Sequence, residues 1–136
     1  MIADPNNDSA KKILLVGHCG PDGSYLRSAV RAALGDVRFL QANDNAQLQK
    51  SLVDGVDLAL FNRDLGYDLD PATGVEMIGA LRAQYPALRM MLVSNHPDAQ
   101  AAAVAAGAQP GFGKRQIGTP RVTEAIRAAL APQAKS

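Results

Sequence analysis

The chain has 136 residues, enough for one domain with one core and too few for two. With 47% hydrophobic residues, 20% charged residues and a formal net charge of +1, it shows no electrostatic preference for nucleic acid or an anionic membrane. No secretory signal or membrane-length apolar run is visible, and a single cysteine excludes an internal disulfide. We therefore expect one cytoplasmic domain over residues 1–136, with its core at about 12–130.

Short apolar runs alternate along the chain with segments whose apolar residues recur at helical spacing. The apolar runs are typical of strands buried on both faces, and glycine or proline ends most of the helical segments. In chain order we expect a strand at 12–16, a helix at 25–34, a strand at 37–40, a helix at 45–53, a strand at 57–61, a helix at 75–85, a strand at 89–94, a helix at 97–106, a strand at 111–114 and a helix at 121–130.

This strict alternation predicts an α/β fold, in which a parallel sheet carries helices on both faces. For five units in this length, the flavodoxin-like, doubly wound, five-stranded sheet with strand order 2-1-3-4-5 fits best. In such sheets a site lies at the carboxyl ends of the strands, near the switch between the first and third strands. Four loop segments would meet there, namely 17–19, 62–64, 94–96 and 113–115.

The residues around these loops resemble response-regulator receiver domains over most of the chain. The strand at 57–61 is similar to the one that ends, in this family, in the phosphoacceptor aspartate, and 74–78 resembles the start of the helix that follows. Ser94 stands where the family has a serine or threonine, and Lys114 follows an Ala-Gly-Ala segment at the spacing of the family's lysine. The resemblance implies a part in two-component or phosphorelay signal transduction.

Several positions depart from the family pattern at the residues that do the chemistry. The resemblance places Asn62 at the phosphoacceptor position, and it places Gly17 and His18 where the family has two acidic residues that hold magnesium. Phosphoryl transfer to a carboxylate needs an anionic nucleophile and a cation held by carboxylates. The interpretation that follows is a pseudo-receiver, a phosphorylation-independent protein–protein interaction module with no enzymatic activity and no cofactor.

Two alternatives stay open. Asp64, two residues past the acceptor position, could enter the pocket, pair with Lys114 and take a phosphoryl group, although such loop carboxylates are more often solvated. His18, Cys19 and His96 would lie at the same sheet edge and could bind a metal or a small ligand. Their spacing matches no common zinc motif, so a hydrogen-bonded histidine and a small buried cysteine are the simpler interpretation.

The predicted helix at 97–106 is rich in alanine and has only two polar side chains, Asp98 and Gln100, which we expect to face water. A surface helix normally has a broader polar face. In receivers the corresponding helix, the fifth strand and the last helix contact partners, so the face at 97–130 is expected to bind another signalling protein or a second copy. The expected interface positions are Ala102, Ala105 and Phe112, whereas Val104 and Ala108 are expected to point inward.

Overall fold

The computed structural model describes residues 11–18 and 20–131. Within this part of the chain five strands alternate with five α-helices, and one turn of 3₁₀-helix at Lys114–Gln116 precedes the last helix. The strands are β1 (Lys11–Val16), β2 (Val37–Ala42), β3 (Leu58–Asn62), β4 (Met90–Val93) and β5 (Gln109–Phe112), and the helices are α2 (Gly20–Leu34), α3 (Asn45–Asp54), α4 (Gly74–Gln84), α5 (Pro97–Ala106) and α6 (Pro120–Leu130).

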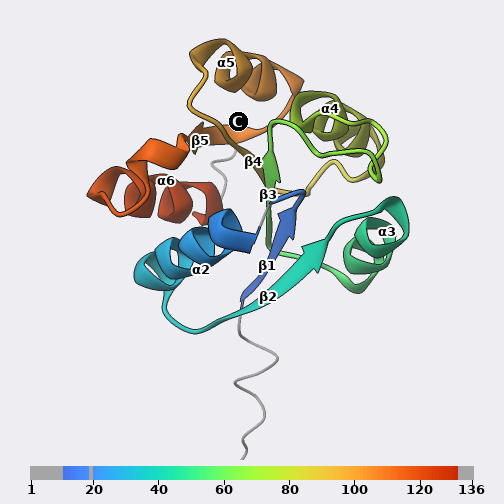
Figure 1. Cartoon of the computed structure of the whole chain (residues 1–136). Coiled ribbons are helices and arrows are strands. Elements are labelled where there is room, and N and C mark those ends of the chain that lie inside the picture. Colours follow the sequence, from blue (N-terminus) through green and yellow to red (C-terminus); the bar gives the residue numbers. More distant parts are fainter. Residues whose placement is uncertain (1–10, 19, 132–136) are drawn as a thin grey trace, which may run out of the picture.

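All neighbouring strands are parallel, in the order β2-β1-β3-β4-β5, which confirms the predicted fold class and strand order. Helices α2 and α6 cover one face of the sheet, and α3, α4 and α5 cover the other (Figure 1). Among the described residues, no helix has the length and apolar character that a bilayer crossing requires.

Several element boundaries differ from the prediction, most of all the start of α2, the end of β2 and both ends of β5. Helix α2 begins at Gly20 rather than near residue 25, because Pro21 and Asp22 suit the first turn of a helix and the chain uses them there. Strand β5 ends at Phe112, since Lys114 already belongs to the 3₁₀ turn.

The central strands β1, β3 and β4 are buried on both faces and separate two apolar clusters. Successive side chains of a strand point to opposite faces, so Leu14 and Val16 enter the α3–α4–α5 cluster, while Ile13 and Leu15 enter the α2–α6 cluster. This is why the strands have continuous apolar runs instead of an alternating pattern.

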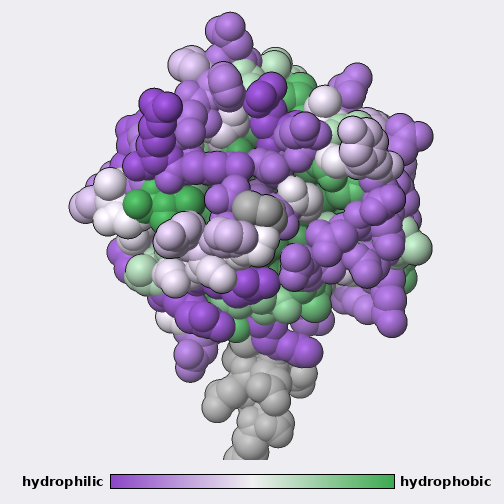
Figure 2. All heavy atoms as spheres, viewed as in Figure 1, coloured by the Kyte–Doolittle hydropathy of each residue, from purple (hydrophilic) through white to green (hydrophobic). Residues whose placement is uncertain are grey.

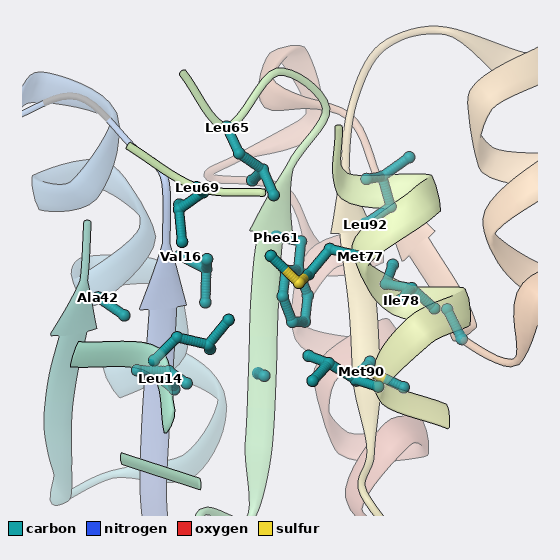
Figure 3. Packing of buried hydrophobic residues seen from close by; sticks show 14 of the residues in the cluster. Leu14, Val16, Ala42, Phe61, Leu65, Leu69, Met77, Ile78, Met90 and Leu92 are labelled. Atoms are coloured by element: carbon teal, nitrogen blue, oxygen red, sulfur yellow. The ribbon is translucent and has the colours of Figure 1, made fainter. Parts of the chain in front are cut away.

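The segment between β3 and α4 adds two leucines to the first of these clusters. Leu65 is 5% exposed and Leu69 is 1% exposed, and both lie at the carboxyl end of the sheet near Val16 and Phe61 (Figure 3). The backbone N–H of Leu65 donates to the Ala72 carbonyl at 2.7 Å. This segment is therefore a packed part of the core.

Its far end is fixed to α3 by a reciprocal pair of hydrogen bonds. The Asn45 amide donates to the Asp70 carbonyl and accepts from the Asp70 N–H, each at 2.9 Å. The backbone of Asp70 thus has both of its polar groups satisfied by one side chain, which holds the segment against the start of α3.

We predict that Leu69→Ala lowers the free energy of unfolding by about 2–4 kcal/mol, because it removes a side chain that is 1% exposed and leaves a cavity. The matched control is Tyr67→Ala in the same segment, where the side chain is fully exposed and the expected change is within about 0.5 kcal/mol. Urea unfolding of both variants measures the difference. Equal losses would mean that Leu69 is not part of the core.

Candidate functional site

The loops after β3, β4 and β5 enclose a small polar cavity of about 180 Å³ at the carboxyl edge of the sheet. It brings together five residues singled out in the sequence, Asn62, Asp64, Ser94, His96 and Lys114, together with Arg63, Val93 and Asn95. Gly17 and His18 are not among the residues that line it.

Asn62 is a hydrogen-bond donor that fastens two segments together. Its Nδ2 donates to the Gly17 carbonyl at 3.2 Å and to the Asp64 carbonyl at 2.9 Å. A carboxylate has no proton to donate and would place its oxygens against these two carbonyls. The two carbonyl acceptors at the end of β3 therefore favour an amide donor at position 62 and disfavour an ionised aspartate there.

Gly17 has no room for a side chain. Its φ is +75°, which favours glycine, and a Cβ placed there would lie 2.8 Å from Leu65 Cδ2 and 3.1 Å from Leu65 Cα. Leu65 thus occupies the space beside Gly17, the first of the two positions that the resemblance pairs with acidic residues. A carboxylate at this position would require the segment after β3 to move.

His18 is turned into the fold. Its ring is 6% exposed, its Nε2 lies 2.9 Å from the Leu60 carbonyl, and its Nδ1 is buried with no hydrogen-bond partner. Burial lowers the pKa of His18 from 6.5 to about 4, the hydrogen bond to Leu60 opposes that shift, and the nearby Lys114 charge adds to it. The imidazole is therefore neutral at pH 7, with its proton on Nε2 where Leu60 can accept it.

Lys114 forms an ion pair with Asp22, with 2.7 Å between Nζ and Oδ2, and both side chains are partly exposed. The pairing of Lys114 with Asp64 considered from the sequence is not formed. Asp64 is exposed, and its Oδ1 accepts instead from the Gly66 N–H at 3.1 Å. Sequence reasoning missed Asp22 as the partner, although the Gly-Pro-Asp signal for an early helix start would have placed it at the same sheet edge.

The candidate metal or ligand residues are only partly placed by the structure. His18 is buried, His96 is exposed at the residue before α5, and Cys19 lies outside the described residues. In the part of the chain that the structure describes, no group of three or more histidine, cysteine or acidic side chains is arranged to hold a metal ion.

Gln100 was expected to face water, and this prediction is wrong. Its Nε2 lies 2.9 Å from the Leu92 carbonyl and 3.1 Å from the carbonyls of both Ser94 and Phe112. The β4–β5 ladder shifts register between Met91 and Val93, and the Gln100 amide supplies donors at this irregularity. The result is a cross-link from α5 to both strands.

Glycine at position 111 leaves room for that cross-link. A Cβ on Gly111 would lie 2.1 Å from the Leu92 carbonyl oxygen and 2.8 Å from Gln100 Oε1. The loops after β4 and β5 are joined further by Asn95, whose Oδ1 accepts from the Arg115 N–H at 3.0 Å. Together these contacts fix the start of α5 against the end of β5.

The outer side of α5 is partly as predicted. Ala102 and Ala105 are exposed and Ala108 is buried, as expected, but Val104 is 45% exposed rather than inward. The helix turns Ala103 to the sheet instead, and the neighbouring Val104 then falls outside. Of the proposed interface residues, Phe112 is 1% exposed and packs in the α2–α6 cluster, so its ring is not on the surface.

Comparison with solved structures gives the fold a name. A putative response regulator from Chloroflexus aurantiacus J-10-fl matches with a TM-score of 0.71 and 18% identity over 91% of this chain and 100% of that one. A response regulator from Thermotoga maritima matches with a TM-score of 0.71 and 14% identity over 90% of this chain and 99% of that one. The signal receiver domain of an HD domain-containing protein from Pseudomonas fluorescens Pf-5 matches with a TM-score of 0.66 and 21% identity over 89% of this chain and 87% of that one.

The chain therefore has the receiver-domain fold of response regulators, as the resemblance in the sequence implied. No family model and no curated protein matches the sequence.

The buried imidazole gives a prediction on acid stability. Because the pKa of His18 falls from 6.5 to about 4 on folding, the unfolded chain binds the proton more readily, and stability is lost as pH falls from 6.5 towards 4. At ~1.4 kcal/mol per pKa unit the loss is about 3 kcal/mol. Urea unfolding across this pH range should show it in the wild type, and His18→Gln should remove that part of the pH dependence.

The control is His96→Gln, since His96 is exposed and this variant should keep the acid loss of the wild type. If His18→Gln loses stability with falling pH as steeply as the wild type, the buried imidazole is not the cause.

Proposed function

We propose that this protein is a pseudo-receiver, a receiver-like domain of bacterial-type two-component signalling that acts in the cytoplasm as a phosphorylation-independent protein–protein interaction module. The observation that carries the proposal is the contact of Leu65 with Gly17, where a Cβ would come within 2.8 Å of the leucine. Leucine takes the space that a metal-binding carboxylate would need.

The charges at the sheet edge support the same function. A phosphoryl group bound there would need a cation held by carboxylates and a positive side chain to balance its oxygens. Lys114 is instead paired with Asp22, and the Asn62 amide bonds two backbone carbonyls. Lys114 and Asn62 thus have their partners within the protein.

Hydrogen bonds at the start of α5 also favour an interaction surface with one fixed shape. Gln100 bonds the carbonyls of Leu92, Ser94 and Phe112, and Asn95 bonds the Arg115 N–H. Moving α5 relative to the sheet would break the Gln100 bonds, at a cost of about 1–3 kcal/mol for each buried carbonyl left without a partner; the Phe112 carbonyl would keep the Ser94 N–H at 2.9 Å. A module with such a fixed face presents the same surface to its partner at all times.

The rival function is phosphoacceptance by Asp64, which lines the cavity with Ser94 and Lys114. We predict that incubation with magnesium and acetyl phosphate or phosphoramidate gives no acyl-phosphate, because no carboxylate stands at the acceptor position or at either acidic position. Intact-mass measurement checks this result. A gain of one phosphoryl group, lost in Asp64→Ala but kept in the neighbouring Asp68→Ala, would show that the protein is a phosphoaccepting receiver instead.

A further inference from the structure

The segment of residues 64–70, here called the acidic loop, presents one aromatic side chain among three carboxylates. Tyr67 is fully exposed, and Asp64, Asp68 and Asp70 are exposed around it. The side chains of Leu65 and Leu69 anchor the loop in the core, and two hydrogen bonds between Asn45 and Asp70 connect it to the start of α3.

This arrangement is favourable for binding. A tyrosine has only two side-chain torsions to fix when a partner buries it, and aromatic anchors of this kind commonly carry much of the energy of an interface. The carboxylates around Tyr67 favour a partner surface that is apolar at its centre and basic at its rim.

A second surface of the same chain has that complementary composition. A cleft of about 520 Å³ lies over β5 beside α5, with apolar walls that include Pro97, Ala101, Val104 and Pro110. Arg115 and Arg121 also line it, and no carboxylate among the described residues does. Within the described ranges neither guanidinium has a hydrogen bond or an ion pair. We call this surface the arginine cleft.

We propose that the acidic loop of one copy docks in the arginine cleft of a second copy, with Tyr67 against the apolar walls and the loop carboxylates against Arg115 and Arg121. The two surfaces match in charge and in their apolar centres, and a net charge of +1 leaves little overall repulsion between copies. Since every copy has both surfaces, two reciprocal contacts about a twofold axis would close a dimer.

The side of the molecule seen in Figure 2 is mainly hydrophilic, with separate apolar patches. The inference rests on the proposed function of an interaction module, and the cleft belongs to the face at 97–130 that the sequence leads us to expect as the partner surface. It adds the chemical character of the partner surface, an aromatic side chain flanked by carboxylates.

Sedimentation velocity of the full chain, from micromolar to millimolar concentration, tests the proposal. We expect a monomer–dimer equilibrium that weakens as salt is raised, because the guanidinium–carboxylate pairs are screened. Tyr67→Ser and Arg121→Glu should each raise the dissociation constant at least about tenfold. Tyr25→Ser is the matched control, since Tyr25 is 62% exposed on α2 and lies outside both surfaces, and it should leave the constant unchanged.

Mixing the two weakened variants gives a sharper test. Tyr67→Ser keeps an intact cleft and Arg121→Glu keeps an intact loop, so their mixture should form a heterodimer through one complete contact, more tightly than either variant self-associates. A wild type that stays monomeric at millimolar concentration, or a mixture without heterodimer, would overturn the proposal. Loss of the dimer in Ala102→Glu but not in Tyr67→Ser would assign association to the alanine side of α5 instead.

These outcomes separate the two proposals. A monomer that also fails to accept a phosphoryl group overturns the loop-in-cleft contact and leaves the pseudo-receiver function standing. A protein that accepts a phosphoryl group overturns that function whatever its state of association.

Discussion

Leu65 packs against the backbone of Gly17 at the point where β1 leaves the sheet, and much of the carboxyl edge follows from that contact. Because Gly17 has a φ of +75° and no space for a Cβ, the backbone there turns so that its carbonyl accepts from Asn62. Asn62 in turn bonds the Asp64 carbonyl and so fixes the start of the acidic loop. The contact between Leu65 and Gly17 is thus linked, through the Gly17 carbonyl, to the position of Asn62 and of the start of the acidic loop.

Further polar groups at this edge are paired within the protein. Lys114 has Asp22, His18 has the Leu60 carbonyl, and the carbonyls at the β4–β5 irregularity have Gln100. Among the buried side-chain nitrogen and oxygen atoms of the described residues, Nδ1 of His18 is the one without a hydrogen-bond partner. Its desolvation is what lowers the pKa of the imidazole and ties part of the protein's stability to pH.

The fold was predictable from the sequence because its signals are local. Continuous apolar runs such as that of β1 identify buried parallel strands, and alternation with helical segments limits the topology to few choices. The details of the site were less predictable because they depend on partners far apart in the chain. Nothing local in Gln100 indicates that a register shift in the neighbouring ladder will need its amide, and nothing in Asp22 indicates that Lys114 is the side chain it meets.

The acidic loop shows the same limit. Its carboxylates are visible in the sequence, and they suggested a possible acceptor at Asp64, but the burial of Leu65 and Leu69 results from three-dimensional packing. That packing changes the interpretation of the loop from a source of catalytic charge to a segment whose leucines pack beside Gly17 and against the core. It also leaves Tyr67 as the loop's outermost side chain.

A double-mutant cycle between Gly17→Asp and Leu65→Ala measures whether Leu65 excludes a carboxylate from position 17. Gly17→Asp alone should destabilise the protein by about 2 kcal/mol or more, through the clash with Leu65 and the positive φ. In the Leu65→Ala background the clash with the leucine side chain is gone, so the destabilisation caused by Gly17→Asp should fall by about 1 kcal/mol or more. Urea unfolding of the wild type, the two single variants and the double variant measures this coupling energy. Penalties that add to within about 0.5 kcal/mol would show that Leu65 does not exclude a carboxylate from position 17.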